Sequence, residues 1–106
     1  MKATAGNKRL QMAGKASWQF CLYVENGNQM SLRAMANLQR LCDEQLPERC
    51  HIEVIDVLSE PRRARTENIV ALPTLIRTAP KPVLRVIGDL SDTQRVVRDL
   101  DMKLSA

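Results

Sequence analysis

The chain of 106 residues carries few side chains that could perform covalent or metal chemistry. Its three cysteines are Cys21, Cys42 and Cys50, and its single histidine is His51. The odd number and scattered spacing of the cysteines argue against a disulfide framework. Cys50 and His51 are adjacent, which is too close for the usual spacing of two metal ligands. We therefore predict no metal site, and we expect Cys21 and Cys42 to be small apolar residues of the core.

Other catalytic arrangements are also missing from the sequence. A thioredoxin-type redox site needs a Cys-x-x-Cys pair at the start of a helix, where the helix N-terminus lowers the pKa of a thiol. The cysteines of this chain lie too far apart for that motif. The sequence also shows no Ser/His/Asp set and no phosphate-binding loop. We predict no catalytic residues, no cofactor and no enzymatic activity.

Composition and charge favour a single soluble domain. Apolar residues make up 44% of the chain and charged residues 26%, with a net charge of +4, which is an ordinary globular balance. No apolar run approaches the roughly 20 residues of a membrane helix, and no signal peptide is visible. These features predict a cytoplasmic protein without a membrane partner.

The first 17 residues differ in character from the rest of the chain. Lys2, Lys8, Arg9 and Lys15 face no acidic residue there, and the segment lacks periodicity. Such a segment favours a disordered tail. A basic tail can bind nucleic acid or an acidic protein, but no nucleic-acid motif accompanies it. We predict a solvated extension over residues 1–17, no nucleic-acid partner, and a folded domain over residues 18–106.

Hydrophobic periodicity and turn residues predict an α/β domain with seven elements. The predicted strands are Trp18–Val24, His51–Val57, Thr74–Arg77 and Val83–Ile87. The predicted helices are Met30–Leu46, a short and strongly charged Arg62–Asn68, and a final helix with Val96, Val97, Leu100 and Leu104 on one face. Ser91 and Gln94 have the spacing of a capping box at the start of that last helix. The order βαβαββα is that of thioredoxin-like domains.

Pro73 interrupts the apolar run Ile69–Ile76 and should lie where a strand begins, because proline cannot donate a ladder hydrogen bond. A proline at a strand entry resembles the cis-proline corner of thioredoxin-like domains. From local chemistry alone, a trans proline at a sheet edge is the commoner alternative. The predicted turn Glu25–Met30, where a thioredoxin would carry its cysteines, has none.

Several short motifs in order carry a more specific resemblance. They are Leu22–Val24, Ser31–Ala34, Val54–Val57, Leu72–Leu75, Pro80–Pro82 and Val86–Ser91. In this order and spacing they resemble the KaiB family of circadian clock proteins over about Phe20–Leu104. The residues that define the fold in this comparison are Pro73, Pro80, Pro82, Gly88 and Asp89. The chain departs from the family in its Glu25–Asn28 turn, in Lys81 within the proline run, and in lacking an acidic C-terminal tail.

The resemblance implies a non-enzymatic regulator that binds the ATPase KaiC and modulates its phosphorylation cycle. It also implies capture of KaiA, where the organism has KaiA, and assembly into homodimers or homotetramers. KaiB-like proteins switch between the thioredoxin-like fold and a ground-state fold of order βαββααβ. The strand-forming pair Val96-Val97 inside a predicted helix and the ambivalent Arg62–Asn68 are compatible with two folds. The departures leave open whether this member serves a circadian oscillator or a stress response.

A cationic surface is the predicted partner-binding site. We expect Arg33, Arg77, Lys81 and Arg85 to lie near one another or on adjoining rims and to meet an acidic surface of KaiC. The alternative is that these are scattered solubilising charges. Two other functions fit the predicted fold, namely a thioredoxin-like redox protein and a sensor domain of a histidine kinase. The missing Cys-x-x-Cys argues against the first, and the short chain argues against the second.

Overall fold

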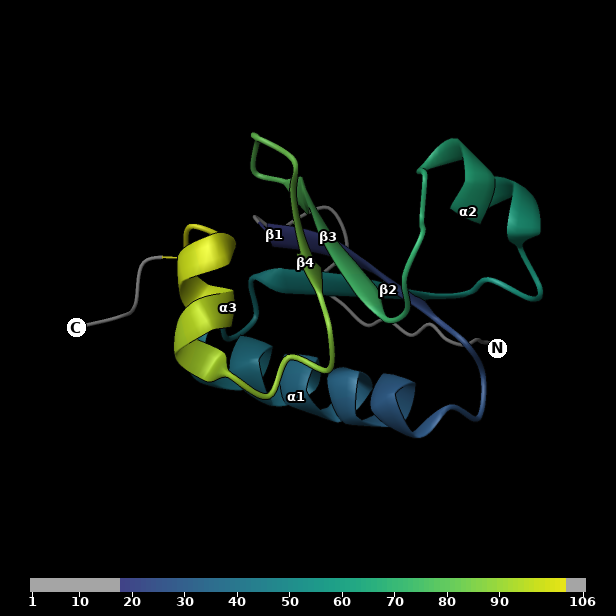
Figure 1. The fold of residues 1–106 in the computed structure, drawn as a ribbon. Coiled ribbons are helices and arrows are strands. Elements are labelled where there is room, and N and C mark those ends of the chain that lie inside the picture. The colour runs from purple at the N-terminus through teal and green to yellow at the C-terminus, as the bar shows by residue number, and fades with distance from the viewer. Residues whose placement is uncertain (1–17, 103–106) are drawn as a thin grey trace.

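The computed structural model describes residues 18–102 and has the predicted order of elements (Figure 1). The strands are β1 (Trp18–Val24), β2 (Cys50–Asp56), β3 (Thr74–Ala79) and β4 (Leu84–Ile87), and the helices are α1 (Gln29–Gln45), α2 (Pro61–Thr66) and α3 (Thr93–Asp99). The βαβαββα order is therefore confirmed. The predicted tail 1–17 and Leu104 lie outside the described residues.

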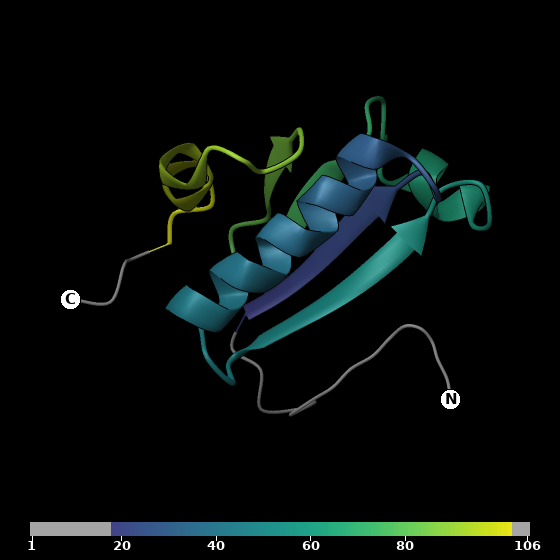
Figure 2. The same ribbon diagram turned by 90° about the horizontal axis from the view of Figure 1, so that it is seen from below.

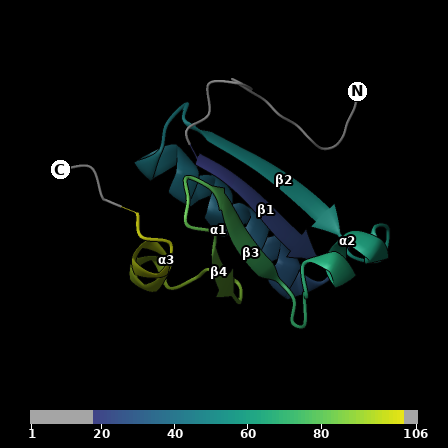
Figure 3. The same ribbon diagram turned by 90° about the horizontal axis from the view of Figure 1, so that it is seen from above.

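The four strands form one mixed sheet of order β2-β1-β3-β4. β1 runs parallel to β2 and antiparallel to β3, and β3 pairs with β4 in an antiparallel hairpin. Helices α1 and α3 cover one face of the sheet, whereas the short α2 lies against the other face at one end (Figures 2 and 3). Among residues 18–102, one face is thus covered by two helices, and the other, here called the open face, only by α2 at one end.

The central strand β1 divides its side chains between these two faces, as the period of two in a strand requires. Phe20, Leu22 and Val24 are buried in the main core with α1 and α3. Tyr23 points to the opposite face, where it packs with Ile55 and Ile76 in a smaller cluster. β1 therefore contributes to both cores and holds the sheet at its centre.

Local signals in the sequence account for both ends of α1. The Asn28 side chain accepts a hydrogen bond from the Ser31 backbone N–H at 3.1 Å, which satisfies one of the free donors of the first turn. At the other end the Leu46 N–H donates to the Cys42 carbonyl at 2.8 Å. Pro47 follows directly and ends the helix, because the residue before a proline is disfavoured in the helical region.

Three prolines shape the approach to the β3–β4 hairpin and its turn. The Leu72–Pro73, Ala79–Pro80 and Lys81–Pro82 peptide bonds are all cis. Pro73 directly precedes β3, so the predicted cis-proline corner is confirmed over the trans alternative. The Pro73 carbonyl accepts a hydrogen bond from the Gly88 N–H at 3.0 Å, which ties the entry of β3 to the exit of β4.

The predicted cap of the last helix is wrong by one residue. Asp92, not Ser91, is the N-cap, and its side chain accepts a hydrogen bond from the Arg95 N–H at 3.1 Å. The Ser91 N–H instead donates to Asp89 Oδ1 at 3.0 Å. Leu90, which stands between Asp89 and Ser91 in the chain, has a φ of 64° and is buried in the core. The burial of Leu90 therefore sets where α3 begins.

Helices in the described part of the chain are too short or too polar to cross a membrane.

Candidate functional site

The position that carries cysteines in a thioredoxin is a hydrogen-bonded polar turn here. Tyr23 pairs with Thr74 across β1 and β3, so the β1–α1 turn lies beside Pro73. In that turn the buried Ser31 hydroxyl accepts a hydrogen bond from the Glu25 N–H at 3.2 Å. No thiol stands in this turn, so its geometry supports a structural corner without a thiol nucleophile.

Arg77 does not belong to an exposed cationic surface, contrary to the prediction. Arg77 is only 2% exposed, and its side chain lies on the face of the sheet that α1 and α3 cover. Arg77 Nη1 donates to the Leu100 carbonyl at 2.6 Å, and Nη2 donates to the Pro82 carbonyl at 2.8 Å. The guanidinium also lies 5.2 Å from the centre of the Trp18 ring, within the range of a cation–π contact.

The buried Arg77 thereby joins the end of α3 to the β3–β4 turn. Among the described residues no carboxylate pairs with it, and its buried Nε has no hydrogen-bond partner. The alternation of β3 offered a signal for this burial, since Leu75 and Arg77 share one face of the strand. This burial was not predicted, because arginine is almost never fully buried without a paired charge.

Arg33 lies where an exposed role was expected, but it already has an acidic partner. Its Nε is 3.3 Å from Asp89 Oδ2, and half of the side chain is exposed. Asn37, one turn further along α1, donates to the Asp89 carbonyl at 2.8 Å. These contacts hold the Gly88–Asp89 turn against α1. The pKa of Asp89 is lowered, first by its hydrogen bonds from Ser91 and then by Arg33.

Lys81 and Arg85 lie apart from Arg33 and from each other. Lys81 is exposed in the β3–β4 turn, at the end of the sheet where Gln19 pairs with Ala79. Asp89 follows β4 at the opposite end of the sheet, and Arg33 of α1 lies beside it. Arg85 pairs with Ile76 and faces the open side of the sheet, where its Nη2 donates to the Glu67 carbonyl at 2.6 Å. The four predicted cations therefore do not form one patch.

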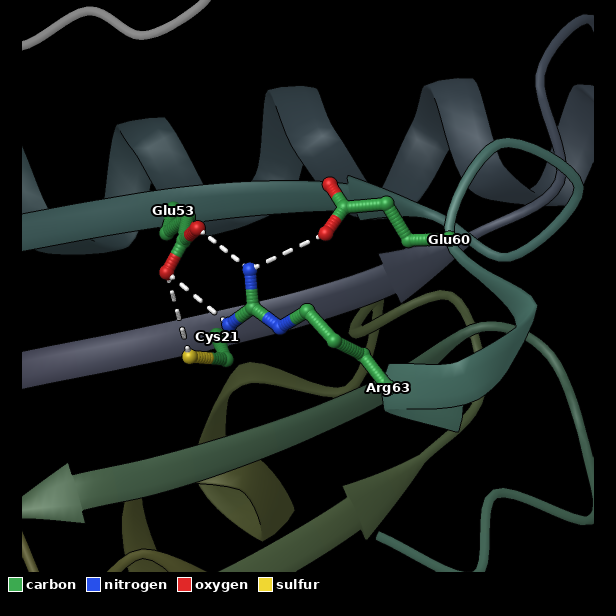
Figure 4. Close-up of polar contacts among 4 residues, drawn as sticks. All are labelled: Cys21, Glu53, Glu60 and Arg63. Atoms are coloured by element: carbon green, nitrogen blue, oxygen red, sulfur yellow. Dashed lines mark hydrogen bonds and ion pairs between the residues drawn. The ribbon is translucent and has the colours of Figure 1, made fainter. Parts of the chain in front are cut away.

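A polar cluster that the sequence analysis missed lies on the open face of the sheet (Figure 4). Arg63 of α2 reaches over β1 to Glu53 of β2, with Nη1–Oε2 and Nη2–Oε1 distances of 2.7 and 3.2 Å. Glu60 Oε1 lies 3.4 Å from the same Arg63 Nη1. The Cys21 thiol donates to Glu53 Oε1 at 3.8 Å. The bidentate pair of Arg63 and Glu53 joins α2 to the edge strand β2.

The cluster borders a groove of about 500 Å³ between α2 and the sheet. Cys21, Tyr23 and Ile76 contribute side chains from β1 and β3, and Arg62 and Glu67 from the α2 segment. One signal for the cluster was available, namely a glutamate inside the predicted strand His51–Val57. Its partner could not be predicted, because the weak pattern over Arg62–Asn68 does not place that helix on either face.

The electrostatics of this cluster oppose thiol chemistry. Burial, followed by the nearby Glu53 carboxylate, raises the pKa of the Cys21 thiol to about 11. The hydrogen bonds from Arg63 lower the pKa of Glu53 below its usual value. At neutral pH the cluster thus holds a neutral thiol beside a compensated ion pair. No group of three or more His, Cys, Asp or Glu side chains within residues 18–102 could hold a metal ion.

Comparisons with solved structures agree with this fold. A chloroplastic thioredoxin z has a TM-score of 0.66 at 22% identity, with 86% of this chain and 84% of that chain covered. The N-terminal domain of SasA from Synechococcus elongatus has the same TM-score at 16% identity, with 99% of both chains covered. The fold is thioredoxin-like, as predicted.

Sequence comparisons identify the family. The KaiB domain matches residues 21–102. The circadian clock protein KaiB3 of Synechocystis sp. is 43% identical over 81 residues, which cover 76% of this chain and 79% of that protein. The circadian clock oscillator protein KaiB of a Prochlorococcus marinus strain is 37% identical over 91 residues, which cover 86% and 87%. The predicted resemblance is confirmed: the chain belongs to the KaiB family.

Proposed function

We propose that this protein is a non-enzymatic regulator that binds a KaiC ATPase and modulates its phosphorylation cycle. The observation that carries the proposal is the match of the KaiB domain to nearly all described residues. The protein would also bind KaiA where the organism has it.

The absence of enzymatic activity is supported by the turn that carries the redox cysteines in a thioredoxin. The turn between β1 and α1 holds no cysteine, and the nearest thiol on the open face, Cys21, is protonated at neutral pH because its pKa is about 11. Since the thiolate is the nucleophile in disulfide exchange, the protein should not catalyse insulin reduction above background. Activity that disappears when all three cysteines are replaced would contradict this part of the proposal.

Binding to KaiC is tested with the full chain immobilised and the KaiC of the same organism in solution with ATP. Wild-type protein should capture KaiC. Failure to do so in both low and high salt would overturn the proposed function.

Lys81 is the cleanest residue for testing the predicted electrostatic contact. It is exposed between Pro80 and Pro82 and makes no ion pair within the described chain. Lys81→Glu should weaken KaiC binding several-fold at low salt and less at high salt, because salt screens exposed charges. The matched control is Arg65→Glu, the same change of charge at an exposed position of α2, which should bind as wild type.

Arg33 is tested separately because it lies at the other end of the sheet. Arg33→Gln removes its charge without placing a second carboxylate beside Asp89. If the Arg33 and Lys81 variants both retain wild-type affinity at low salt while folded, neither residue contributes to the binding surface. That result would not bear on whether the protein binds KaiC, which the capture experiment with the wild-type protein decides.

We further propose that the free protein populates a second fold as a homodimer or homotetramer. Features of the described fold support this: Asn68, Leu90 and Asp101 have positive φ values, and α2 buries no residue. Such positions are costly unless the surroundings hold them. Light scattering should show an oligomer at micromolar concentration. Light scattering that shows only a monomer would contradict the proposal, and so would chemical shifts that place a helix across Thr93–Asp99 in the main species.

A further inference from the structure

Two of the three thiols are in direct contact, which the sequence analysis did not anticipate. Cys50 Sγ lies 2.6 Å from Cys42 Sγ, and both cysteines are free. Cys42 is buried at 3% exposure in the last turn of α1, whereas Cys50 is half-buried as the first residue of β2. Both pack against the main core. The end of a helix and the start of a strand therefore hold the two sulfur atoms together.

The short connection between α1 and β2 produces this contact. Pro47 ends the helix, and Glu48 reverses the chain with a φ of 61° in the left-handed region. The Arg49 N–H donates to the Leu46 carbonyl at 3.1 Å, and the Arg49 carbonyl accepts from the Trp18 N–H at 2.9 Å. These backbone hydrogen bonds fix Cys50 beneath the end of the helix. No backbone rearrangement is needed to bring the thiols together.

We propose that Cys42 and Cys50 form an oxidative modification site, a reversible intramolecular disulfide that joins the end of α1 to the start of β2. The oxidant is a low-molecular-weight disulfide of the glutathione type. The proposal is independent of KaiC binding, since it rests on the geometry of the two thiols alone.

The chemistry proceeds by two thiol–disulfide exchanges. The more accessible Cys50 loses its proton to solvent, and its thiolate attacks glutathione disulfide. This step forms a mixed disulfide on Cys50 and releases one glutathione thiolate. Cys42 then attacks the Cys50 sulfur, the bond from that sulfur to glutathione breaks, and the departing glutathione thiolate takes up the proton that Cys42 gives up. In sum, two protein thiols are oxidised to one disulfide, and one glutathione disulfide is reduced to two glutathione molecules.

The order of attack follows from the environments of the two sulfurs. The hydrogen bond with Cys50 and burial both raise the pKa of the Cys42 thiol, so Cys42 resists deprotonation and direct attack on a bulky oxidant. Once Cys50 carries glutathione, its sulfur lies against Cys42, and the high local concentration of the Cys42 thiol favours the second exchange over attack by free glutathione.

Cys21 cannot take part in this bond. It shares the open face of the sheet with Glu53, to which it donates a hydrogen bond, whereas Cys42 packs in the core on the other face. The chain thus contains its own matched control. Cys21→Ser should leave the disulfide unchanged, while Cys50→Ser should abolish it.

The experiment uses the full-length protein in a series of glutathione buffers that run from reducing to oxidising. Samples are quenched with acid, alkylated and digested with trypsin. Because trypsin cleaves after Arg49, the disulfide appears as a cross-linked pair of peptides, residues 41–49 and 50–62. Wild type and Cys21→Ser should give this pair, with the intact protein lighter by the mass of two hydrogens, and dithiothreitol should reverse the change.

Thermal unfolding provides a second readout. Oxidation closes a short loop and restricts the unfolded chain, so the oxidised wild type should unfold at least about 5 °C above the reduced wild type. Cys50→Ser should show no such redox dependence. If Cys50→Ser does not fold, the comparison of oxidised and reduced wild type still decides the question.

Three results would overturn the proposal. The first is the absence of any disulfide in oxidising buffer. The second is accumulation of the mixed disulfide between Cys50 and glutathione without attack by Cys42. The third is a disulfide that includes Cys21 or joins two molecules.

Discussion

The N-terminal half, Trp18–Asp56, and the C-terminal half, Pro61–Met102, each supply two strands to the sheet but differ in how those strands are supported. The N-terminal half has a helix of 17 residues and two strands of seven. The C-terminal half has helices of six and seven residues and strands of six and four. The first half thus contains long, regular elements, and the second contains short ones linked by turns.

The difference extends to the contacts that stabilise each half. α1 has a side-chain cap at Asn28 and buries an apolar stripe that includes Leu38 and Leu41. The C-terminal half depends on single polar contacts, above all Arg77 on the Leu100 and Pro82 carbonyls. Isolated helices shorter than about 12–15 residues are marginal in water, so tertiary contacts must hold α2 and α3. The comparison indicates that local sequence builds the first half and distant contacts build the second.

The largest expected effect comes from truncating the core of the N-terminal half. Leu38 is 1% exposed and packs among β1, α1 and α3 residues. Leu38→Ala should lower the free energy of unfolding by about 2–5 kcal/mol, because a buried leucine leaves a cavity. Urea denaturation followed by circular dichroism measures the loss. Leu32→Ala, on the same helix but 54% exposed, should cost less than about 1 kcal/mol; equal losses would contradict the assigned face of α1.

Removal of the buried guanidinium tests the C-terminal half. Arg77→Met leaves the Leu100 and Pro82 carbonyls without a donor and should destabilise the fold by about 2–3 kcal/mol. Amide exchange should accelerate over α3 and the β3–β4 turn more than over α1. Arg85→Met serves as the control. Because Arg85 is partly exposed, this change should lower the free energy of unfolding by less than about 1 kcal/mol. A more stable Arg77→Met variant would show that burial of the unpaired charge costs more than its hydrogen bonds return.

A smaller effect is expected at the turn that follows β4. Gly88 has φ of +120°, and a Cβ placed there would contact nothing within 4 Å. Gly88→Ala should therefore destabilise the fold through backbone strain alone, by about 1–3 kcal/mol. Gly27→Ala, at φ of +84° in the N-terminal half, should cost less because this angle lies nearer the left-handed region that other residues adopt. The opposite ranking in urea denaturation would refute the contrast.

The smallest effect is the pH dependence of the pair that joins the halves, Glu53 and Arg63. The folded pKa of Glu53 lies below its ordinary value of 4.5, so the stabilisation is present above that value and is lost as pH falls through the folded pKa. Both side chains are partly exposed, so the contribution should stay under about 1 kcal/mol. Unfolding of wild type and Glu53→Gln between about pH 7 and pH 3 should converge at the acid end. Glu44→Gln, at an exposed position of α1, should track the wild type throughout.

The sequence by itself determined the order of elements, the cis-proline corner as a candidate, and the family. Periodicity placed β1 and α1 within a residue of their observed bounds, because a buried stripe and a terminating proline are local signals. The motifs around Pro73 and Gly88-Asp89 identified the KaiB family, because backbone-restricting residues at fixed spacing are specific. The cysteine-free turn also excluded a thioredoxin redox pair from the sequence alone.

Only the tertiary structure decided which polar side chains meet. The four predicted cations do not form one patch, because the strand register buries Arg77 and directs Arg85 toward α2. That register is set by the pairing of the whole sheet. The cap of α3 moved from Ser91 to Asp92 because Leu90 is drawn into the core. The contacts between Cys42 and Cys50 and between Glu53 and Arg63 depend on a chain reversal at Glu48 and on the placement of α2. Neither contact can be predicted from a local sequence pattern. The first depends on how the chain reverses between α1 and β2, and the second depends on how α2 packs against the sheet.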